Sequence, residues 1–161
     1  MNLLKFHNKI KGYTQNRQPG IEADMEPKPI AELEEYKAAG KLENKVALIT
    51  GGDSGIGRAI AILYAKEGAN VAIGYYDEHQ DAEDTVNRLQ EMGVKAKAYA
   101  HDLKDEKQSQ KLIKDVINDF GSLNILVNNG GVQFPRDHFD DITPQQVKDT
   151  FMTVSYTHLT L

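Results

Sequence analysis

Cysteine and tryptophan are both missing from this chain of 161 residues. Without cysteine there can be no disulfide and no thiolate metal site, and the five histidines show no paired spacing suited to zinc. We therefore expect no metal site. No apolar stretch approaches the length that spans a membrane, and the first thirty residues hold only short apolar patches. We expect a protein of the reducing cytoplasm with no membrane partner.

A block of charge of one sign is also missing. The formal net charge is -5, from 19 Lys and Arg against 24 Asp and Glu, and these charges are spread along the chain. A basic block that could neutralise a phosphate backbone does not occur, so nucleic acid is not an expected partner. The length suits one domain of ordinary size.

Residues 1–44 are polar and show no sustained helical or strand period. Pro27 and Pro29 lie close together there, which disfavours regular structure. We interpret the segment as an N-terminal arm, in which Ala31 to Ala39 can form a short helix.

From Val46 onward, short apolar runs alternate with one-sided helical stripes. The expected strands are Val46–Ile49, Val71–Ile73, Lys95–Ala100 and Asn124–Val127. A helical stripe follows each of the first three runs, and Thr143, Pro144 and Gln146 predict the start of a further helix that runs to about Thr153. Apolar strands joined by crossover helices predict a parallel sheet covered on both faces. The fold class is therefore α/β.

Three glycines, Gly51, Gly55 and Gly57, lie between the first strand and the first helix. Glycine allows positive φ and a close approach of the backbone to a ligand, and a helix N-terminus attracts anions. Such a turn can hold a diphosphate. A tight strand-to-helix turn without a ligand is the alternative, and three glycines alone do not separate the two.

The segment Thr50-Gly51-Gly52-Asp53-Ser54-Gly55-Ile56-Gly57 resembles the Thr-Gly-x-x-x-Gly-x-Gly signature of the short-chain dehydrogenase/reductase family. Asn128-Asn129-Gly130-Gly131 resembles the Asn-Asn-Ala-Gly signature of that family, with glycine in place of alanine at Gly130. Asp102 matches the family's aspartate that binds the adenine ring. The resemblance implies a Rossmann-type doubly wound parallel sheet, of which about four strands in the order 3-2-1-4 are present.

Two of these matches have structural alternatives. Asn129-Gly130 could be a hairpin turn, although the residues after Gly131 do not alternate as a strand would. Asp102 could simply cap the next helix. Because the three matches occur in order at the expected strand ends, we favour cofactor binding for both. We assign no role to His101.

The choice between nicotinamide cofactors is normally made at the end of the second strand, where an acid holds the ribose of NAD. Tyr75 and Tyr76 occupy that place, with Asp77 and Glu78 slightly beyond. Neither an acid nor an arginine stands at Tyr75, and we favour NADP or the use of both NADP and NAD. A tyrosine there could stack on the adenine or cover the edge of the sheet. The residues expected to contact the cofactor are Gly51, Asp53, Ser54, Gly55, Ile56, Gly57, Tyr75, Tyr76, Asp102, Leu103, Asn129, Gly130 and Gly131.

The resemblance implies hydride transfer between nicotinamide and an alcohol or carbonyl substrate, with a tyrosine, a lysine four residues later, a serine and an asparagine as catalytic groups. Tyr156 has Thr160 at the lysine position, and Ser155 adjoins it directly. Without a neighbouring cation its phenol would keep a pKa of about 10. We therefore assign no catalytic residue and expect this chain to be inactive. A non-catalytic nucleotide-binding half-domain and a scaffold without nucleotide are the alternatives.

The last eight residues, Val154–Leu161, are the translation of GTC TCT TAT ACA CAT CTG ACG CTG, which resembles a transposase-type sequencing adapter. We interpret residues 154–161 as a non-native tail and 45–153 as the first part of the nucleotide-binding domain; a native divergent tail is the alternative. The fourth strand would then be a sheet edge that exposes Ile125 and Val127, so we expect the chain to be poorly soluble or partly ordered.

The resemblance extends into the arm. Gln18-Pro19-Gly20, Met25–Pro29 and Gly40-Lys41-Leu42 resemble a branch of the family with an N-terminal extension. This branch includes general-stress-type proteins, glucose dehydrogenase-like proteins and aldehyde reductases. Family members are often tetramers, so we expect the full-length parent to be a homo-oligomer.

Overall fold

Four parallel strands form the centre of the structure, a computed structural model that describes residues 15 and 20–158, except for the side chains of 155–158. The strands are β1 (Val46–Thr50), β2 (Asn70–Tyr75), β3 (Ala96–Ala100) and β4 (Ile125–Val127). They pair in the order β3-β2-β1-β4. The fold class and the strand order predicted from the sequence are confirmed.

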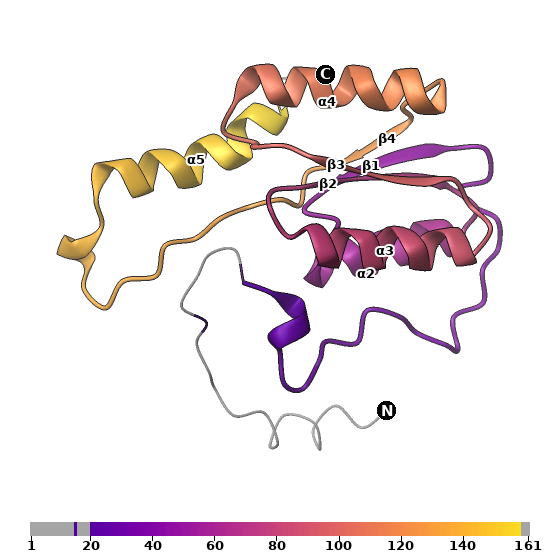
Figure 1. The fold of residues 1–161 in the computed structure, drawn as a ribbon, viewed down its shortest axis with the longest axis horizontal. Helices are drawn as coiled ribbons and strands as arrows, with labels where there is room; N and C mark the ends of the chain where they lie inside the picture. The colour runs from indigo at the N-terminus through magenta and orange to yellow at the C-terminus, as the bar shows by residue number, and fades with distance from the viewer. Residues whose placement is uncertain (1–14, 16–19, 159–161) are drawn as a thin grey trace.

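Helices cover both faces of this sheet. They are α2 (Gly55–Lys66), α3 (His79–Glu91), α4 (Glu106–Phe120) and α5 (Pro144–His158), with short 3-10 turns η1 (Glu22–Asp24) and η2 (Phe139–Asp141). Figure 1 shows α2 and α3 on one face and α4 on the other, while α5 follows a long extended segment and approaches α4. The first two crossovers thus lie on one face and the third lies on the other, so both faces are covered, as a doubly wound sheet requires.

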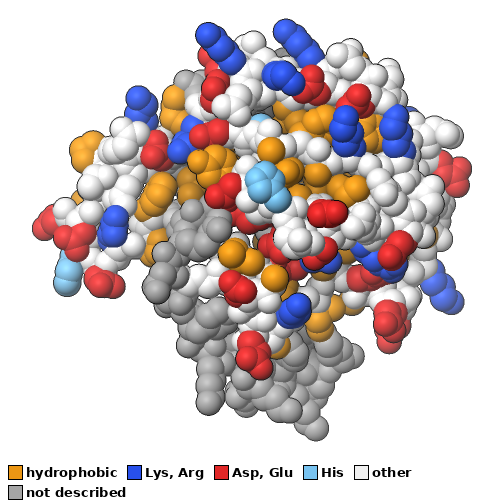
Figure 2. All heavy atoms as spheres, viewed as in Figure 1, with side chains coloured by type: hydrophobic (Ala, Val, Ile, Leu, Met, Phe, Trp, Pro, Cys, Tyr) orange, Lys and Arg blue, Asp and Glu red, His pale blue; other side chains and the backbone are white. Residues whose placement is uncertain are grey.

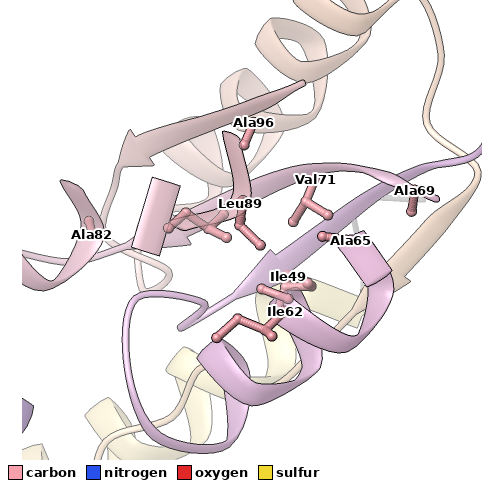
Figure 3. Close-up of a cluster of buried hydrophobic side chains, with 10 residues drawn as sticks. Ile49, Ile62, Ala65, Ala69, Val71, Ala82, Leu89 and Ala96 are labelled. Atoms are coloured by element: carbon pink, nitrogen blue, oxygen red, sulfur yellow. The ribbon is translucent and has the colours of Figure 1, made fainter. Parts of the chain in front are cut away.

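The strand pleat divides the core into two layers. Ile49 and Val71 point toward the α2–α3 face, where they lie near Leu89 (Figure 3). Ile73 belongs to the same cluster. Val46, Leu48 and Ala72 point the other way, toward Leu112 and Val116 of α4. All five residues of β1 are buried. A strand buried on both faces needs a continuous apolar run, which explains why the sequence pattern identified it.

The N-termini of α4 and α5 are fixed by side-chain caps. The Asp105 side chain accepts hydrogen bonds from the N–H groups of Lys107 and Gln108 at the start of α4. At α5, the Gln146 N–H donates to Thr143 Oγ1 at 3.2 Å and the Thr143 N–H donates to Gln146 Oε1 at 3.0 Å. This reciprocal pair is the capping box expected from the sequence. The helix that it opens continues to His158, beyond the predicted end near Thr153.

The short helix predicted for 31–39 is wrong. This part of the arm contains only a turn at residues 34 and 35, and it runs along the outer side of the α2–α3 layer (Figure 1). Glu32 forms hydrogen bonds to the Arg88 guanidinium, both at 3.0 Å, and an ion pair with Lys66 at 3.0 Å. The Ala39 N–H donates to Glu67 Oε2 at 3.1 Å. The backbone N–H of Ala39 is therefore bonded to the side chain of a residue distant in sequence, and not to the carbonyl of a preceding helical turn.

β4 lies at an edge of the sheet that the described residues form, and its three residues are half-buried. Charges of both signs are spread over the face seen in Figure 2. Among residues 15 and 20–158, no helix has the length and apolarity to cross a membrane. The same residues contain no group of three or more His, Asp or Glu placed to hold a metal ion.

Candidate functional site

A cavity of about 520 Å³ lies at the carboxyl ends of the strands. In a doubly wound sheet this is the edge where ligands bind, because the helix N-termini and the βα turns face it. All of the cofactor residues predicted from the sequence line it, with the exception of Gly57. The lining residues that the sequence analysis did not select are Gly74, Glu78, His101, Lys104, Val132, Phe134, Asp149 and Thr153.

The turn between β1 and α2 forms one wall of this cavity. Gly51 has a φ of 62° and Gly55 a φ of 51°, both in the left-handed region that favours glycine. The N–H groups of Gly51 and Gly52 donate to the Gly74 carbonyl at 2.8 and 3.2 Å. The end of β2 therefore holds the turn in place.

Gly57 serves the packing of this turn and does not face the cavity. A Cβ at Gly57 would lie 1.9 Å from the Gly51 carbonyl oxygen. The first turn of α2 and the end of β1 can come this close only where no side chain intervenes.

Gly55 and Gly131 both line the cavity and face open space. A Cβ added at either residue would meet no heavy atom within 4 Å. Gly55 begins α2, and its own N–H donates to Glu22 of the arm. The N–H groups that follow it in the first turn and the helix dipole favour an anion. The geometry therefore fits a diphosphate that approaches the backbone between these two glycines.

Thr50 joins the end of β1 to the segment that follows β4. Its Oγ1 accepts hydrogen bonds from the N–H groups of Asn129 at 3.1 Å and Gly130 at 3.0 Å. The Asn129 Nδ2 in turn donates to the carbonyls of Thr50 and Gly51, both at 3.0 Å. Asn129 thus fixes the cavity wall through its own side-chain donors. No strand follows β4 among the described residues, so Asn129-Gly130 is not a hairpin turn.

Tyr75 and Asp102 lie at the ends of the neighbouring strands. The Tyr75 hydroxyl is 2.8 Å from His79 Nδ1, and burial raises the pKa of this phenol. Asp102 Oδ1 accepts a hydrogen bond from the Lys104 N–H at 2.9 Å, and Lys104 Nζ lies 3.8 Å from Oδ2. The N-cap of the next helix is Asp105. The alternative role of Asp102 as the cap of that helix is therefore excluded.

His101 is a buried lining residue to which the sequence analysis gave no role. Its ring lies against Gly74, where an added Cβ would be 2.4 Å from the ring carbon Cε1. Burial lowers the pKa of His101, because it disfavours the charged imidazolium. Gly74, near the end of β2, was the signal for this contact, because strand glycines mark a close approach.

Asp53 and Glu78 bring buried carboxyl groups to the same cavity. Their residues are only 5% and 8% exposed. Burial raises the pKa of Asp53, and it raises the pKa of Glu78 to about 7 with a contribution from the neighbouring Asp77. Desolvation disfavours the charged form of a carboxyl group, so both shifts have the same physical origin.

The remaining lining residues come from the segment after β4 and from α5. Val132 and Phe134 lie in the extended segment, and Asp149 and Thr153 lie on α5. No local pattern could have placed them, since their position depends on the path of the chain back toward the cavity. The side chain of Tyr156 falls outside the described residues, so its rejection as a catalytic group stays a prediction.

Comparison with known proteins agrees with this geometry. The family model of the short chain dehydrogenases matches residues 45–160 of this chain. General stress protein 39 of Bacillus subtilis is 47% identical over 159 residues, which cover 99% of this chain and 56% of that protein. This chain spans about half the length of the curated relatives it matches.

Two solved structures share the fold. A short chain dehydrogenase from Burkholderia cenocepacia in complex with NADP is 35% identical with a TM-score of 0.70, over 74% of this chain and 50% of that one. Carveol dehydrogenase from Mycobacterium avium in complex with NAD is 21% identical, also with a TM-score of 0.70, over 76% of this chain and 50% of that one. On the sequence match to residues 45–160 and the sheet of four parallel strands, the chain belongs to the short-chain dehydrogenase family.

Proposed function

We propose that this chain is the nucleotide-binding half of an NAD(P)-dependent oxidoreductase that transfers hydride between nicotinamide and an alcohol or carbonyl substrate. The observation that supports it is the cavity between Gly55 and Gly131, open at both glycines and placed at the N-terminus of α2. A nicotinamide dinucleotide bound there would accept or donate the hydride.

The chain's own residues would bind and orient that dinucleotide. The backbone N–H of Ile56 and the helix dipole at the start of α2 would hold the diphosphate, beside the Gly55 N–H that Glu22 already caps. Asp102 and Leu103, at the end of β3, would contact the adenine. Thr50 and Asn129 would keep the two sides of the cavity at a fixed separation through the hydrogen bonds that join them.

A binding titration tests this assignment. The purified chain, first checked by circular dichroism and thermal melting, is titrated with NADH and with NADPH while tyrosine fluorescence is followed. We expect saturable binding of at least one of them. A folded sample that binds neither would support a scaffold whose glycines only turn the chain.

We propose further that the catalytic groups lie outside this chain and that residues 154–161 are not native. The sequence contains no Tyr-x-x-x-Lys pair, so the chain alone should not turn over alcohols or aldehydes. Genomic DNA amplified across codon 153 tests both points. We expect an open frame that encodes Ser, Tyr-x-x-x-Lys and an Asn at position 154. A genomic read that keeps the codons for Val154–Leu161 and a stop would exclude this proposal.

The substrate is proposed as a small alcohol or carbonyl compound, and the parent protein as a homo-oligomer, by similarity to the family. Light scattering of the protein expressed from the genomic frame measures its assembly state. We expect a tetramer, and a monomer at micromolar concentration would contradict the expectation.

A further inference from the structure

We propose that Glu22 of the N-terminal arm lowers the affinity of this cavity for its dinucleotide, because its carboxylate already caps the helix end that binds the diphosphate. The arm and the dinucleotide then oppose each other, so that binding of one weakens binding of the other. This inference rests on the proposed nucleotide binding and adds control of that site by a segment outside the nucleotide-binding domain.

The arm places a carboxylate at the first N–H group of α2. Glu22 Oε2 accepts a hydrogen bond from the Gly55 N–H at 2.5 Å, and the Glu22 residue is only 7% exposed. Gly55 also lines the cavity, and a Cβ added there would meet no heavy atom within 4 Å. Because consecutive residues are only about 3.8 Å apart, a diphosphate held by the Ile56 N–H lies next to the Glu22 carboxylate.

Two further contacts hold this carboxylate in place. Glu22 Oε1 accepts a hydrogen bond from Arg58 Nη1 at 2.9 Å, and the Glu22 N–H donates to Asp81 Oδ2 at 3.1 Å. Figure 1 shows η1, which begins at Glu22, on the side of the sheet that α2 and α3 cover. The arm is therefore attached to both helices at this point, through its side chain and through its backbone.

The charges around this helix end disfavour a second anion. A helix N-terminus carries about half a positive charge, and the Glu22 carboxylate already offsets it. Arg58 is paired with Glu22 and is not among the residues that line the cavity. Burial raises the pKa of Asp53 in the cavity wall, and the charges of Asp81 and Glu22 raise it further. The negative charge of Glu22 is therefore felt at the cavity wall.

This arrangement has two consequences that a simple helix cap would not have. NADH and NADPH contain the same negatively charged diphosphate, so removal of the Glu22 charge should tighten the binding of both. Coupling between two binding events is reciprocal, so a bound dinucleotide should also weaken the contact of Glu22 with α2. A carboxylate that only stabilised the helix would not weaken binding, and its loss would not tighten it.

Equilibrium titration with NADH and with NADPH, followed by nicotinamide fluorescence, tests the first consequence. Glu22→Gln keeps an oxygen that can accept from the Gly55 N–H but removes the charge. We expect each dinucleotide that the unmodified chain binds to bind this variant at least about fivefold more tightly. Glu34→Gln removes the same charge from an exposed position of the arm and should leave the affinities unchanged. A folded Glu22→Gln chain with unchanged or weaker binding would overturn the proposal.

Hydrogen exchange of the unmodified chain tests the second consequence and does not depend on a variant that folds. The Glu22 N–H is bonded to Asp81, whereas the Ala39 N–H is bonded to Glu67 at the opposite end of α2. A saturating concentration of the dinucleotide that binds more tightly should accelerate exchange at Glu22 by at least about fivefold and leave Ala39 unchanged.

Unchanged or slower exchange at Glu22, in a chain that binds the dinucleotide, would overturn the proposal. A folded chain that binds neither dinucleotide, with or without the Glu22→Gln change, would instead overturn the proposed function.

Discussion

Glu22 of the arm accepts a hydrogen bond from the backbone N–H of Gly55, the first residue of α2, at 2.5 Å. Its second carboxylate oxygen accepts from Arg58 at 2.9 Å, and its own N–H donates to Asp81 at 3.1 Å. The Glu22 residue is 7% exposed. A side chain 33 positions before the helix thus supplies the cap that the N-terminus of α2 needs.

Replacing Glu22 by alanine should destabilise the fold. The change would leave the Gly55 N–H and the Arg58 guanidinium without their carboxylate partner, which costs about 1–3 kcal/mol. Chemical denaturation of the purified chain measures this free energy of unfolding. Glu34→Ala, at an exposed position of the same arm, is the control and should change it by less than about 0.5 kcal/mol. Equal stability of the two variants would show that the arm does not dock as described.

Thr50→Val should destabilise the junction between β1 and β4. Valine has nearly the shape of threonine but would leave the N–H groups of Asn129 and Gly130 without an acceptor, at a cost of about 1–3 kcal/mol. Thr50→Ser keeps the hydroxyl and should lose only about 0.8 kcal/mol for the buried methyl group. Thermal unfolding of both variants measures their loss of stability, and the loss should be larger for Thr50→Val. If Ser proves as harmful as Val, the hydroxyl is not the stabilising group.

Local patterns predicted the sheet, and the resemblance of three motifs to the family's signatures predicted most of the cavity wall. Buried parallel strands need continuous apolar runs, and the glycine-rich turn has a fixed place between the first strand and the first helix. The predicted strand 46–49 became Val46–Thr50, and the predicted strand 71–73 became Asn70–Tyr75. These small extensions come from backbone pairing with neighbouring strands, which a single segment does not reveal.

Contacts between distant segments were beyond reach of the sequence. The short helix expected for 31–39 is replaced by a chain held to α2 and α3 through Glu32 and Glu67. The cap at Gly55 comes from Glu22, and the meeting of Asp53 with Glu78 depends on how the turn packs against the end of β2. Propensity and periodicity describe neighbours along the chain, so they could not identify these pairs.

Gly57→Ala should disrupt the turn between β1 and α2. The added Cβ would lie 1.9 Å from the Gly51 carbonyl oxygen, and backbone must move to relieve this contact. We expect a loss of about 3 kcal/mol or more in the free energy of unfolding. Gly131→Ala introduces the same methyl group into open space and should change stability by less than about 0.5 kcal/mol. Denaturant melts of the two variants make the comparison, and similar losses in both would contradict it.

Glu78 should make the stability of the chain depend on pH in a specific window. Burial raises its pKa from an ordinary value of 4.5 to about 7 in the folded chain, so the folded state holds this proton more firmly than the unfolded state does. The resulting stabilisation is complete below a pH of about 4.5 and is lost as the pH rises through about 7.

Glu78→Gln removes this titration while keeping a side chain of similar size. The melting temperature of the variant relative to the unmodified chain should therefore rise between a pH of about 4.5 and about 8, and it should be nearly constant below that range. Thermal melts at matched ionic strength across these values measure the difference, with Glu83→Gln as the exposed control. A difference that stays flat from pH 4.5 to 8 would mean that the Glu78 carboxyl keeps its ordinary pKa, and that it is not desolvated at the cavity wall.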